Sequence, residues 1–230
     1  MKKSKLLVAV ISFAILIGLG CLTPCLGQLH NLSDELPKFE VGAQFTSLTI
    51  PDYNNGATEP GFGGRFTFNL NRSVALEAVG NFFPHKCRFC GQGPTGDNSG
   101  NITQVLAGVK AGKRFESWGI FAKARPGIVS FSDGNSEYVP LANGSTFPFE
   151  FRNNRATHFA VDLGAVLEFY PSKRIVTRFE AGDTLIHYGE RQTNFFGFDP
   201  VTGNTTLIPF TLRSETRHNF QFVAGVGWRF

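Results

Sequence analysis

The chain has 230 residues, which suits one domain of ordinary size, and it carries 26 Gly and 25 Phe but a single Met. So much Phe and Gly with so little Met favours β structure over a helical bundle. The formal net charge is +4, with 22 Lys and Arg against 18 Asp and Glu. Three of the lysines lie in a terminal segment that we expect to be removed, which leaves 19 basic residues against 18 acidic ones. A chain so close to neutral gives no electrostatic basis for binding nucleic acid.

Residues 1–27 have the organisation of a secretory signal peptide. Lys2, Lys3 and Lys5 form a basic start, an apolar stretch runs from residue 6 to residue 19, and small residues end at Gly27. We predict cleavage before Gln28, so that the protein is secreted. Residues 28–38 would then form a periplasmic N-terminal segment, and residues 39–230 the folded domain.

A lipoprotein signal is the competing interpretation of this N-terminal segment, with Cys21 or Cys25 acylated. It is disfavoured because Gly18 stands where such signals usually have Leu, and because Pro24 precedes Cys25. Beyond residue 28 no run approaches 18 apolar residues, so no helical span is expected there. If the domain lies in a membrane, it must be a closed barrel, because lipid offers no partner to unpaired backbone groups.

From Phe39 onward, apolar side chains recur at every second position, which is the period of a β-strand. In the final stretch, apolar and aromatic side chains at 220, 222, 224, 226, 228 and 230 alternate with polar or small ones. We predict eight strands, over residues 39–49, 62–70, 73–83, 102–115, 118–130, 155–170, 174–187 and 216–230.

The connections between these segments alternate between short and long. Tight turns lie at residues 70–73, 115–118 and 170–174, and long polar loops lie near residues 50–61, 84–101, 131–154 and 188–215. Such alternation places all long loops on one rim. The sequence therefore predicts an all-β fold, an eight-stranded antiparallel up-and-down transmembrane β-barrel with four long loops on one rim and short turns on the other.

The polar face of the strands indicates which side of the barrel meets lipid. In a soluble barrel of the lipocalin type, the competing fold, the apolar face would point inward. Glycines recur beside long charged side chains on the polar face, which suits a crowded interior, because glycine weakens strands and has no use on a solvated exterior. We therefore predict that the apolar face contacts lipid, with aromatic residues at its ends. Twelve charged residues would then form a lumen charge network: Glu40, Arg65, Glu77, Lys110, Arg114, Lys123, Arg125, Asp162, Glu168, Arg178, Glu180 and Arg229.

Three residues depart from this pattern. Lys113 and Asp183 fall on the predicted lipid face. We expect Lys113 to extend toward the interface near Phe115, whereas Asp183 requires a bulge, a register slip or a place near the outer rim. Pro126 removes a ladder donor from the fifth segment and predicts a bulge there.

The chain ends in GVGWRF, residues 225–230, with aromatic residues at alternate positions and Phe last. This ending resembles the C-terminal signal of outer-membrane β-barrels, and residues 39–230 resemble the OmpA-type eight-stranded barrel superfamily in pattern, strand count and loop asymmetry. The resemblance implies that the barrel-assembly machinery recognises Gly225, Trp228 and Phe230. It also implies a multi-pass protein of the bacterial outer membrane, surrounded by lipid and lipopolysaccharide. The peptidoglycan-binding domain of full-length OmpA-type proteins is not expected, because the chain stops at Phe230.

The second long loop contains the pair Cys87 and Cys90, separated by two residues. In an oxidising exterior this spacing predicts a local disulfide that stiffens the loop. A redox site would need a helix N-terminus after a strand, and a metal site using His85 would need a further ligand from elsewhere. The disulfide is the favoured interpretation, and the other two stay open.

The third and fourth long loops are unusually apolar. Phe147, Phe149 and Phe151 alternate, and three phenylalanines cluster between residues 195 and 198. We expect the strands to continue beyond the bilayer as an extracellular sheet. An exposed patch that binds an extracellular ligand is the other interpretation, and the two are compatible.

Three functions from different classes suit such a barrel. We favour a non-enzymatic role in envelope integrity or surface interaction, with the lumen plugged by paired charges, because an unpaired buried charge is costly. The second is a small ion or solute pore. The third is an outer-leaflet lipid-modifying enzyme, which is disfavoured because none of His85, His158, His187 and His218 stands in the His-x-Ser arrangement of the lipid A deacylases. No cofactor, metal or catalytic residue is expected.

Overall fold

The computed structural model describes residues 37–51, 57–86, 99–140, 149–198 and 205–230, which form ten strands. Eight of them close into a barrel: β1 (Phe39–Ile50), β2 (Ala57–Asn69), β3 (Val74–Lys86), β4 (Ser99–Arg114), β5 (Trp118–Pro140), β6 (Phe149–Phe169), β7 (Ile175–Tyr188) and β10 (Glu215–Arg229). The other two, β8 (Arg191–Phe198) and β9 (Thr205–Leu212), pair as a separate hairpin. Within these described ranges no helix is long and apolar enough to cross a membrane.

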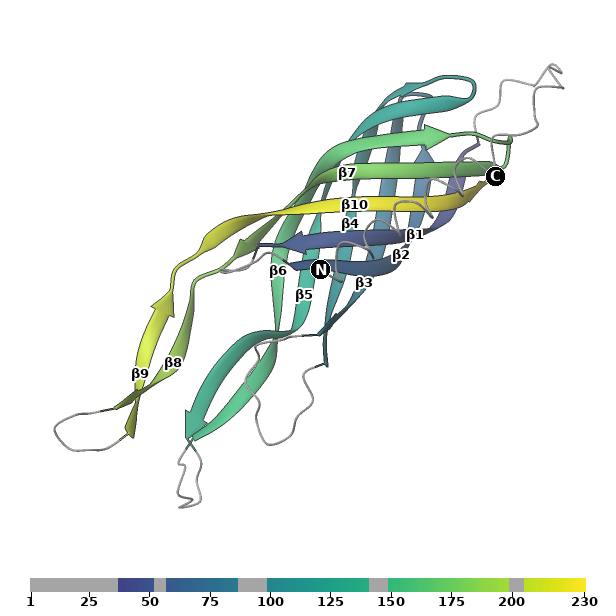
Figure 1. Ribbon diagram of the computed structural model, residues 1–230. Helices are drawn as coiled ribbons and strands as arrows, with labels where there is room; N and C mark the ends of the chain where they lie inside the picture. The colour runs from purple at the N-terminus through teal and green to yellow at the C-terminus, as the bar shows by residue number, and fades with distance from the viewer. Residues whose placement is uncertain (1–36, 52–56, 87–98, 141–148, 199–204) are drawn as a thin grey trace, which may run out of the picture.

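Each barrel strand pairs antiparallel with its neighbours, in the order β1-β10-β7-β6-β5-β4-β3-β2 (Figure 1). The first and last strands close the cylinder, and Phe39 and Phe230 exchange two backbone hydrogen bonds of 3.0 Å at this seam. The predicted eight-stranded up-and-down barrel is therefore confirmed.

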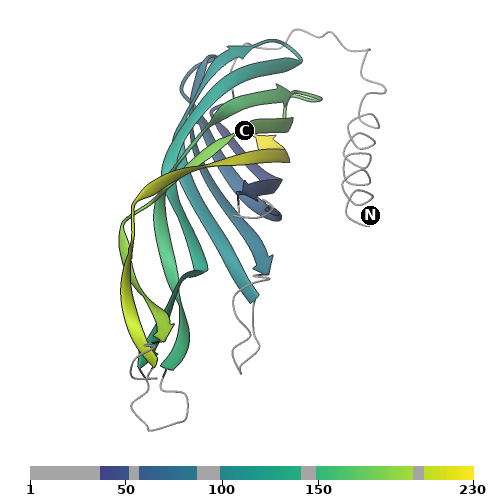
Figure 2. The same ribbon diagram turned by 60° about the vertical axis from the view of Figure 1, so that its left-hand side comes forward.

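Two projecting ribbons change the predicted boundaries of the third and fourth long loops. The predicted strands 118–130 and 155–170 are longer in the structure, because β5 continues to Pro140 and β6 begins at Phe149, with a register shift between Phe131 and Asn135. The fourth loop contains the β8–β9 hairpin, and β8 lies beside β5. Both ribbons project from the same end of the barrel (Figures 1 and 2).

The short turns at the opposite rim are held by their own polar side chains. The Asn71 Oδ1 atom accepts hydrogen bonds from the backbone N–H groups of Ser73 and Val74, both at 2.8 Å. The Ser172 hydroxyl accepts from Ile175 N–H at 3.1 Å in the turn between β6 and β7. Asn and Ser stabilise tight turns in this way, which explains why these two connections need so few residues.

The apolar face of the strands points outward, as the sequence predicts. Phe222, Val226 and Leu163 have exposed fractions of 42%, 53% and 42% and lie on the outer wall. Aromatic residues gather near the short-turn rim, where Phe115 stacks on Trp118 with ring centroids 4.3 Å apart. The lipocalin-type alternative, with its apolar face inward, is thereby excluded.

The bulge predicted at Pro126 is wrong. Pro126 pairs with Val161 of β6 without a register change, and the ladder to β4 keeps its register on both sides of the position. The β4–β5 pairing is interrupted only between Leu106 and Val109. The strands therefore accommodate the missing N–H donor without an inserted residue.

Candidate functional site: the filled lumen

All twelve residues of the lumen charge network point into the barrel. Eleven are buried, and the side chain of the twelfth, Arg114, is only 7% exposed. The seven basic and five acidic members come from all eight barrel strands. Alternation along each strand brings them together, because successive side chains point to opposite faces of a sheet.

Arg178 of β7 lies at the centre of this network and is fully buried. Its Nη2 atom donates to Glu77 Oε2 at 2.8 Å, and its Nη1 atom donates to the other oxygen of Glu77. Its Nε atom lies 2.6 Å from Glu180 Oε1. One guanidinium therefore joins two carboxylates from different strands.

A second cluster surrounds Arg125 of β5. Its Nη2 atom lies 2.5 Å from Asp162 Oδ2 and 2.6 Å from Glu180 Oε2. Lys123, on the same strand, contacts the same two carboxylates at 2.9 and 2.7 Å. Lys110 of β4 completes the network through Glu168, at 2.5 Å. Such pairing is required because an unpaired charge in this buried position costs several kcal/mol, on the order of 3–5.

The network ends at the short-turn rim beside Tyr170. The Arg114 Nε atom donates to the Tyr170 hydroxyl, which donates to Glu168 Oε2, both at 2.9 Å. Arg229 lies over the Tyr170 ring at 4.5 Å and 3.4 Å from Glu40. Burial and the neighbouring Glu168 carboxylate raise the pKa of Tyr170, so its hydroxyl remains a donor at neutral pH.

A ring of amide side chains crosses the lumen above the charges, toward the long loops. Gln44 donates to Asn81 at 2.7 Å, Asn81 donates to Gln104 at 2.7 Å, and Gln104 donates to Gln221 at 3.2 Å. Gln221 in turn donates to Thr46 at 3.0 Å. These groups link β1, β3, β4 and β10 across the interior and serve as hydrogen-bond partners for one another.

An apolar cap lies above the amide ring at the loop end of the lumen. Its buried members are Leu48, Phe83, Ile102, Val129, Ala160 and Ile186, and Ile50, Phe131 and Tyr188 pack against them. The alternation along the strands predicts apolar residues on the outer wall and does not predict this cap. The signal was present, because these residues stand at positions of inward parity near the strand ends.

Inward glycines make room for the long charged side chains. A Cβ atom at Gly42 would lie 3.2 Å from Arg65 Nη2, and one at Gly227 would lie 3.3 Å from the same atom. A Cβ at Gly164 would lie 3.0 Å from Lys123 Cε. These glycines let the basic side chains lie flat against the inner wall, which supports the interpretation of the polar face as a crowded interior.

The two unexpected charges of the outer face both have partners. Asp183 contacts His218 Nδ1 at 2.5 Å and accepts the Asn219 N–H at 2.9 Å, so it needs neither a bulge nor a register slip. Lys113 lies 5.3 Å from the centre of the Phe115 ring near the short-turn rim. Sequence reasoning did not identify His218 as the partner of Asp183, because that pairing depends on the register between β7 and β10.

The predicted disulfide between Cys87 and Cys90 lies outside the described residues, and so does Phe147. Among the side chains that the structure describes, no group of three His, Cys, Asp or Glu residues is arranged to hold a metal ion. Gly225 and Trp228 lie on β10, and Phe230 directly follows it at the seam with β1.

A closed antiparallel barrel with an apolar exterior and a polar, filled interior is an eight-stranded barrel of the outer-membrane type. The chain is similar to Neisserial surface protein A, with 11% identity over 84% of this chain and 97% of that one, and a TM-score of 0.49. It is also similar to Ail, the attachment invasion locus protein of Yersinia pestis, with 13% identity over 84% of this chain and 99% of that one, and a TM-score of 0.44. A third likeness is to the outer membrane protease OmpT of Escherichia coli, with 11% identity over 88% of this chain and 100% of that one, and a TM-score of 0.31. No protein-family model matches the chain, and no curated protein does. These likenesses concern the fold, and no activity is carried over from them.

Proposed function

We propose that the protein is a non-conducting barrel of the bacterial outer membrane that supports envelope integrity or surface interaction. The filled lumen carries this proposal, because three successive layers occupy it. These are the lumen charge network, the amide ring and the apolar cap. An interior of eight strands is only wide enough to be packed by side chains, which agrees with such filling.

The outer wall supports the same location. Its exposed phenylalanines, leucines and valines would be unfavourable in water over so large an area and suit lipid tails. We propose that the chain is exported, loses residues 1–27, and is recognised during assembly through Gly225, Trp228 and Phe230. The Cys87–Cys90 disulfide belongs to the same proposal, because both residues lie in a predicted long loop on the extracellular side.

The extracellular ribbons favour surface interaction over a purely structural role. Ile208 and Phe210 of β9 have exposed fractions of 52% and 49%, and this ribbon projects away from the barrel (Figure 1). Exposed apolar residues on a projecting sheet are typical of a surface that binds another molecule. The interacting molecule would meet this ribbon before it meets the lipid-facing wall.

The lumen layers predict that the purified protein does not conduct ions. In planar bilayers we expect no steady current from the natural chain, because buried side chains of all three layers occupy the described part of the lumen. A variant with Phe83→Ala in the apolar cap should also stay closed, because the amide ring and the lumen charge network lie beneath that position. Steady, reproducible channels from the natural chain would show that the protein is a pore.

The enzymatic alternative finds less support. A lipid-modifying triad on the outer wall would need a serine activated by a histidine that an acid orients. Asp183 and His218 supply an acid and a histidine on that wall, and Thr216, two residues before His218, has its hydroxyl 3.1 Å from the Nδ1 atom of a different histidine, His187. An unchanged lipid A mass spectrum after expression would exclude a lipid A-modifying activity.

A further inference from the structure

Two glycines of the outer wall differ from the inward glycines of the barrel. Gly64 of β2 and Gly80 of β3 are exposed and lie opposite each other in the strand register. A Cβ atom at the inward Gly108 would lie 2.1 Å from the Ala124 carbonyl oxygen, so packing requires glycine there. At Gly80 a Cβ would meet nothing within 4 Å, and at Gly64 it would meet only the Gly42 carbonyl oxygen at 3.8 Å. Packing inside the protein therefore does not require glycine at either outward position.

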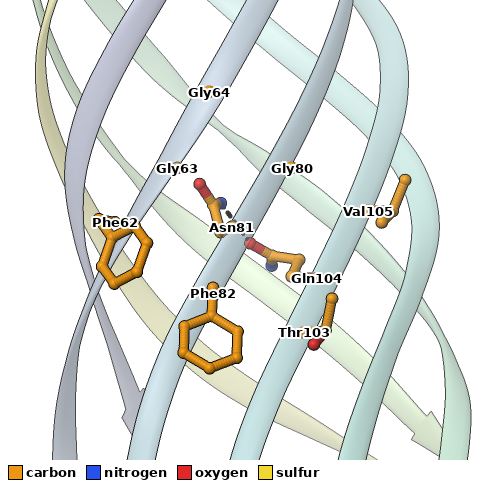
Figure 3. A pocket seen from close by; sticks show the side chains of 9 residues that line it. All are labelled: Phe62, Gly63, Gly64, Gly80, Asn81, Phe82, Thr103, Gln104 and Val105. Atoms are coloured by element: carbon orange, nitrogen blue, oxygen red, sulfur yellow. Dashed lines mark hydrogen bonds between the residues drawn. The ribbon is translucent and has the colours of Figure 1, made fainter.

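The paired glycines form the floor of a hollow of about 390 Å³ in the outer wall. Figure 3 shows Phe62 and Phe82 on one side of it, with Val105 on the neighbouring strand. The two phenylalanine rings are 5.6 Å apart and tilted by 51°. Asn81 and Gln104 also border the hollow, but their side chains are buried in the amide ring on the lumen side. Thr103 of β4 adds one hydroxyl, and the rest of the surface that the hollow offers outward is apolar.

Glycine inside a strand costs about 0.5–1 kcal/mol relative to alanine, because it loses more backbone freedom on folding. A strand glycine without an internal steric reason often marks a bulge, a tight bend or a place where a ligand or another chain approaches the backbone closely. The registers of β2 and β3 with their neighbours are continuous, so neither glycine belongs to a bulge. Two such glycines in register point to an external group that lies against β2 and β3.

We propose that this hollow binds one acyl chain of an outer-leaflet lipid, an inference that rests on the proposed outer-membrane location. The hollow belongs to the lipid-facing wall, where Phe66 and Val41 on neighbouring strands are exposed as well. Its outward lining carries no charge, so it suits a hydrocarbon chain and not a headgroup.

The position of the hollow along the strands selects the leaflet. Strand β2 runs from the loop end to the short-turn end and β3 runs back, so Phe62 and Phe82 both lie on the loop side of the glycines. The long loops are the extracellular ones in barrels of this type. Gly64 and Gly80 each lie six residues from the short turn, at Leu70 and Val74. At about 3.3 Å per residue and a tilt of about 40°, this is roughly 15 Å, just beyond the middle of an apolar band about 25 Å tall. The hollow therefore begins in the outer half of the bilayer, and the two phenylalanines flank the chain that descends into it.

Photolabelling tests the proposal on the full mature chain in vesicles of phosphatidylethanolamine and phosphatidylglycerol. A small fraction of the phosphatidylethanolamine carries a diazirine on one acyl chain, and the labelled residues are mapped by mass spectrometry. We expect label to concentrate on Phe62, Phe82 and Val105. Gly80→Leu should reduce this label about tenfold, a loss of about 1.4 kcal/mol in binding.

The matched control is Ala181→Leu, which places the same leucine side chain at an exposed outward position of β7, on the opposite side of the closed barrel. It should leave the label at the hollow unchanged. Heat-modifiable gel migration verifies that each variant folds, and Gly64→Leu fills the same hollow from β2 if Gly80→Leu does not fold. Label spread evenly around the barrel in the natural chain overturns the proposal.

Two further outcomes have separate meanings. A dimer of the natural chain that Gly80→Leu dissociates, measured by light scattering in detergent, would overturn the lipid proposal and identify a second copy as the occupant. Absence of label from the whole outer wall, including Phe222 and Val226, would instead overturn the membrane location itself. The acyl-chain proposal can thus fail while the proposed location stands.

Discussion

Replacing Arg178 with methionine is expected to lower the free energy of unfolding by about 3–5 kcal/mol. The substitution keeps an unbranched but shorter side chain and removes the bidentate partner of Glu77 and the Nε contact of Glu180. Glu77 then keeps the longer contacts to Lys110 and Arg125, at 3.5 and 3.3 Å. Urea unfolding in lipid vesicles, followed by tryptophan fluorescence, measures the change. Both tryptophans of the chain, Trp118 and Trp228, lie on the outer wall and report on contact with lipid.

The matched control for Arg178→Met is Arg217→Met, which removes another ion-paired arginine of the same chain. Arg217 and its partner Glu215 have side chains that are 40% and 50% exposed, so water screens the pair and the expected loss is below about 1 kcal/mol. Adding Glu77→Gln to Arg178→Met should recover part of the stability, because the buried carboxylate that has lost its two shortest contacts is removed. Equal losses in the two single variants would mean that water reaches the lumen charges, and would contradict the hypothesis of a plugged lumen.

Replacing Phe230 with alanine is expected to prevent most of the protein from reaching its folded, membrane-inserted form. The resemblance of the chain end to an assembly signal predicts failed recognition in cells. Membrane fractions and heat-modifiable gel migration measure the folded fraction. Phe220→Ala is the control, because Phe220 has an exposed fraction of 57% against 60% for Phe230 and lies on the same outer face. It should assemble like the natural chain.

A third variant separates recognition from packing at the seam. The Phe230 ring stacks on the Phe39 ring, with centroids 6.0 Å apart, so Phe39→Ala removes the same ring contact and leaves the chain end intact. If recognition of the end is what matters, Phe39→Ala assembles and Phe230→Ala does not. Equal failure of both would assign the effect to the seam contact.

Strand number, topology and sidedness could be predicted from the sequence because all three follow from a period of two. Once the apolar face of a strand is assigned to the outer wall, the residues between its apolar positions must face the lumen. This places Arg125 and Glu180 inside and Phe222 outside. Turn chemistry supplied the connections, as at Asn71. These features depend on neighbouring residues and need no long-range information.

Depth along the barrel was harder to predict, because alternation distinguishes two faces and does not distinguish one end of a strand from the other. Leu48 and Phe83 have the parity of the inward face, but inward residues were expected to be polar. The closed barrel brings these two apolar side chains together at the loop end. The pairing of the buried charges was difficult to predict for a similar reason. Arg178 meets Glu77 across 101 positions of the chain, and only the register of every intervening strand sets that distance.

The loop ribbons were the least predictable part of the fold. The β8–β9 pairing depends on contacts between residues 191–198 and 205–212, which carry no strict alternation, since Phe195 and Phe196 are adjacent. The hollow at Gly64 and Gly80 was equally hidden, because the sequence gives no way to separate an outward glycine from one that packing requires. Only the position of a hypothetical Cβ distinguishes them.

The seam between β1 and β10 has a consequence for how such a chain must be delivered to its membrane. Thr46 of β1 accepts a hydrogen bond from Gln221 of β10, 175 positions later in the chain. One edge of β1 pairs with β2, and the other has no partner until β10 is in place. During export the first strand therefore waits with an open edge, prone to pair with any stray strand. Because β1 and β10 are the first and last barrel strands of the chain, we expect their pairing to be the last to form, and protection of the open β1 edge until then to raise the yield of folded protein.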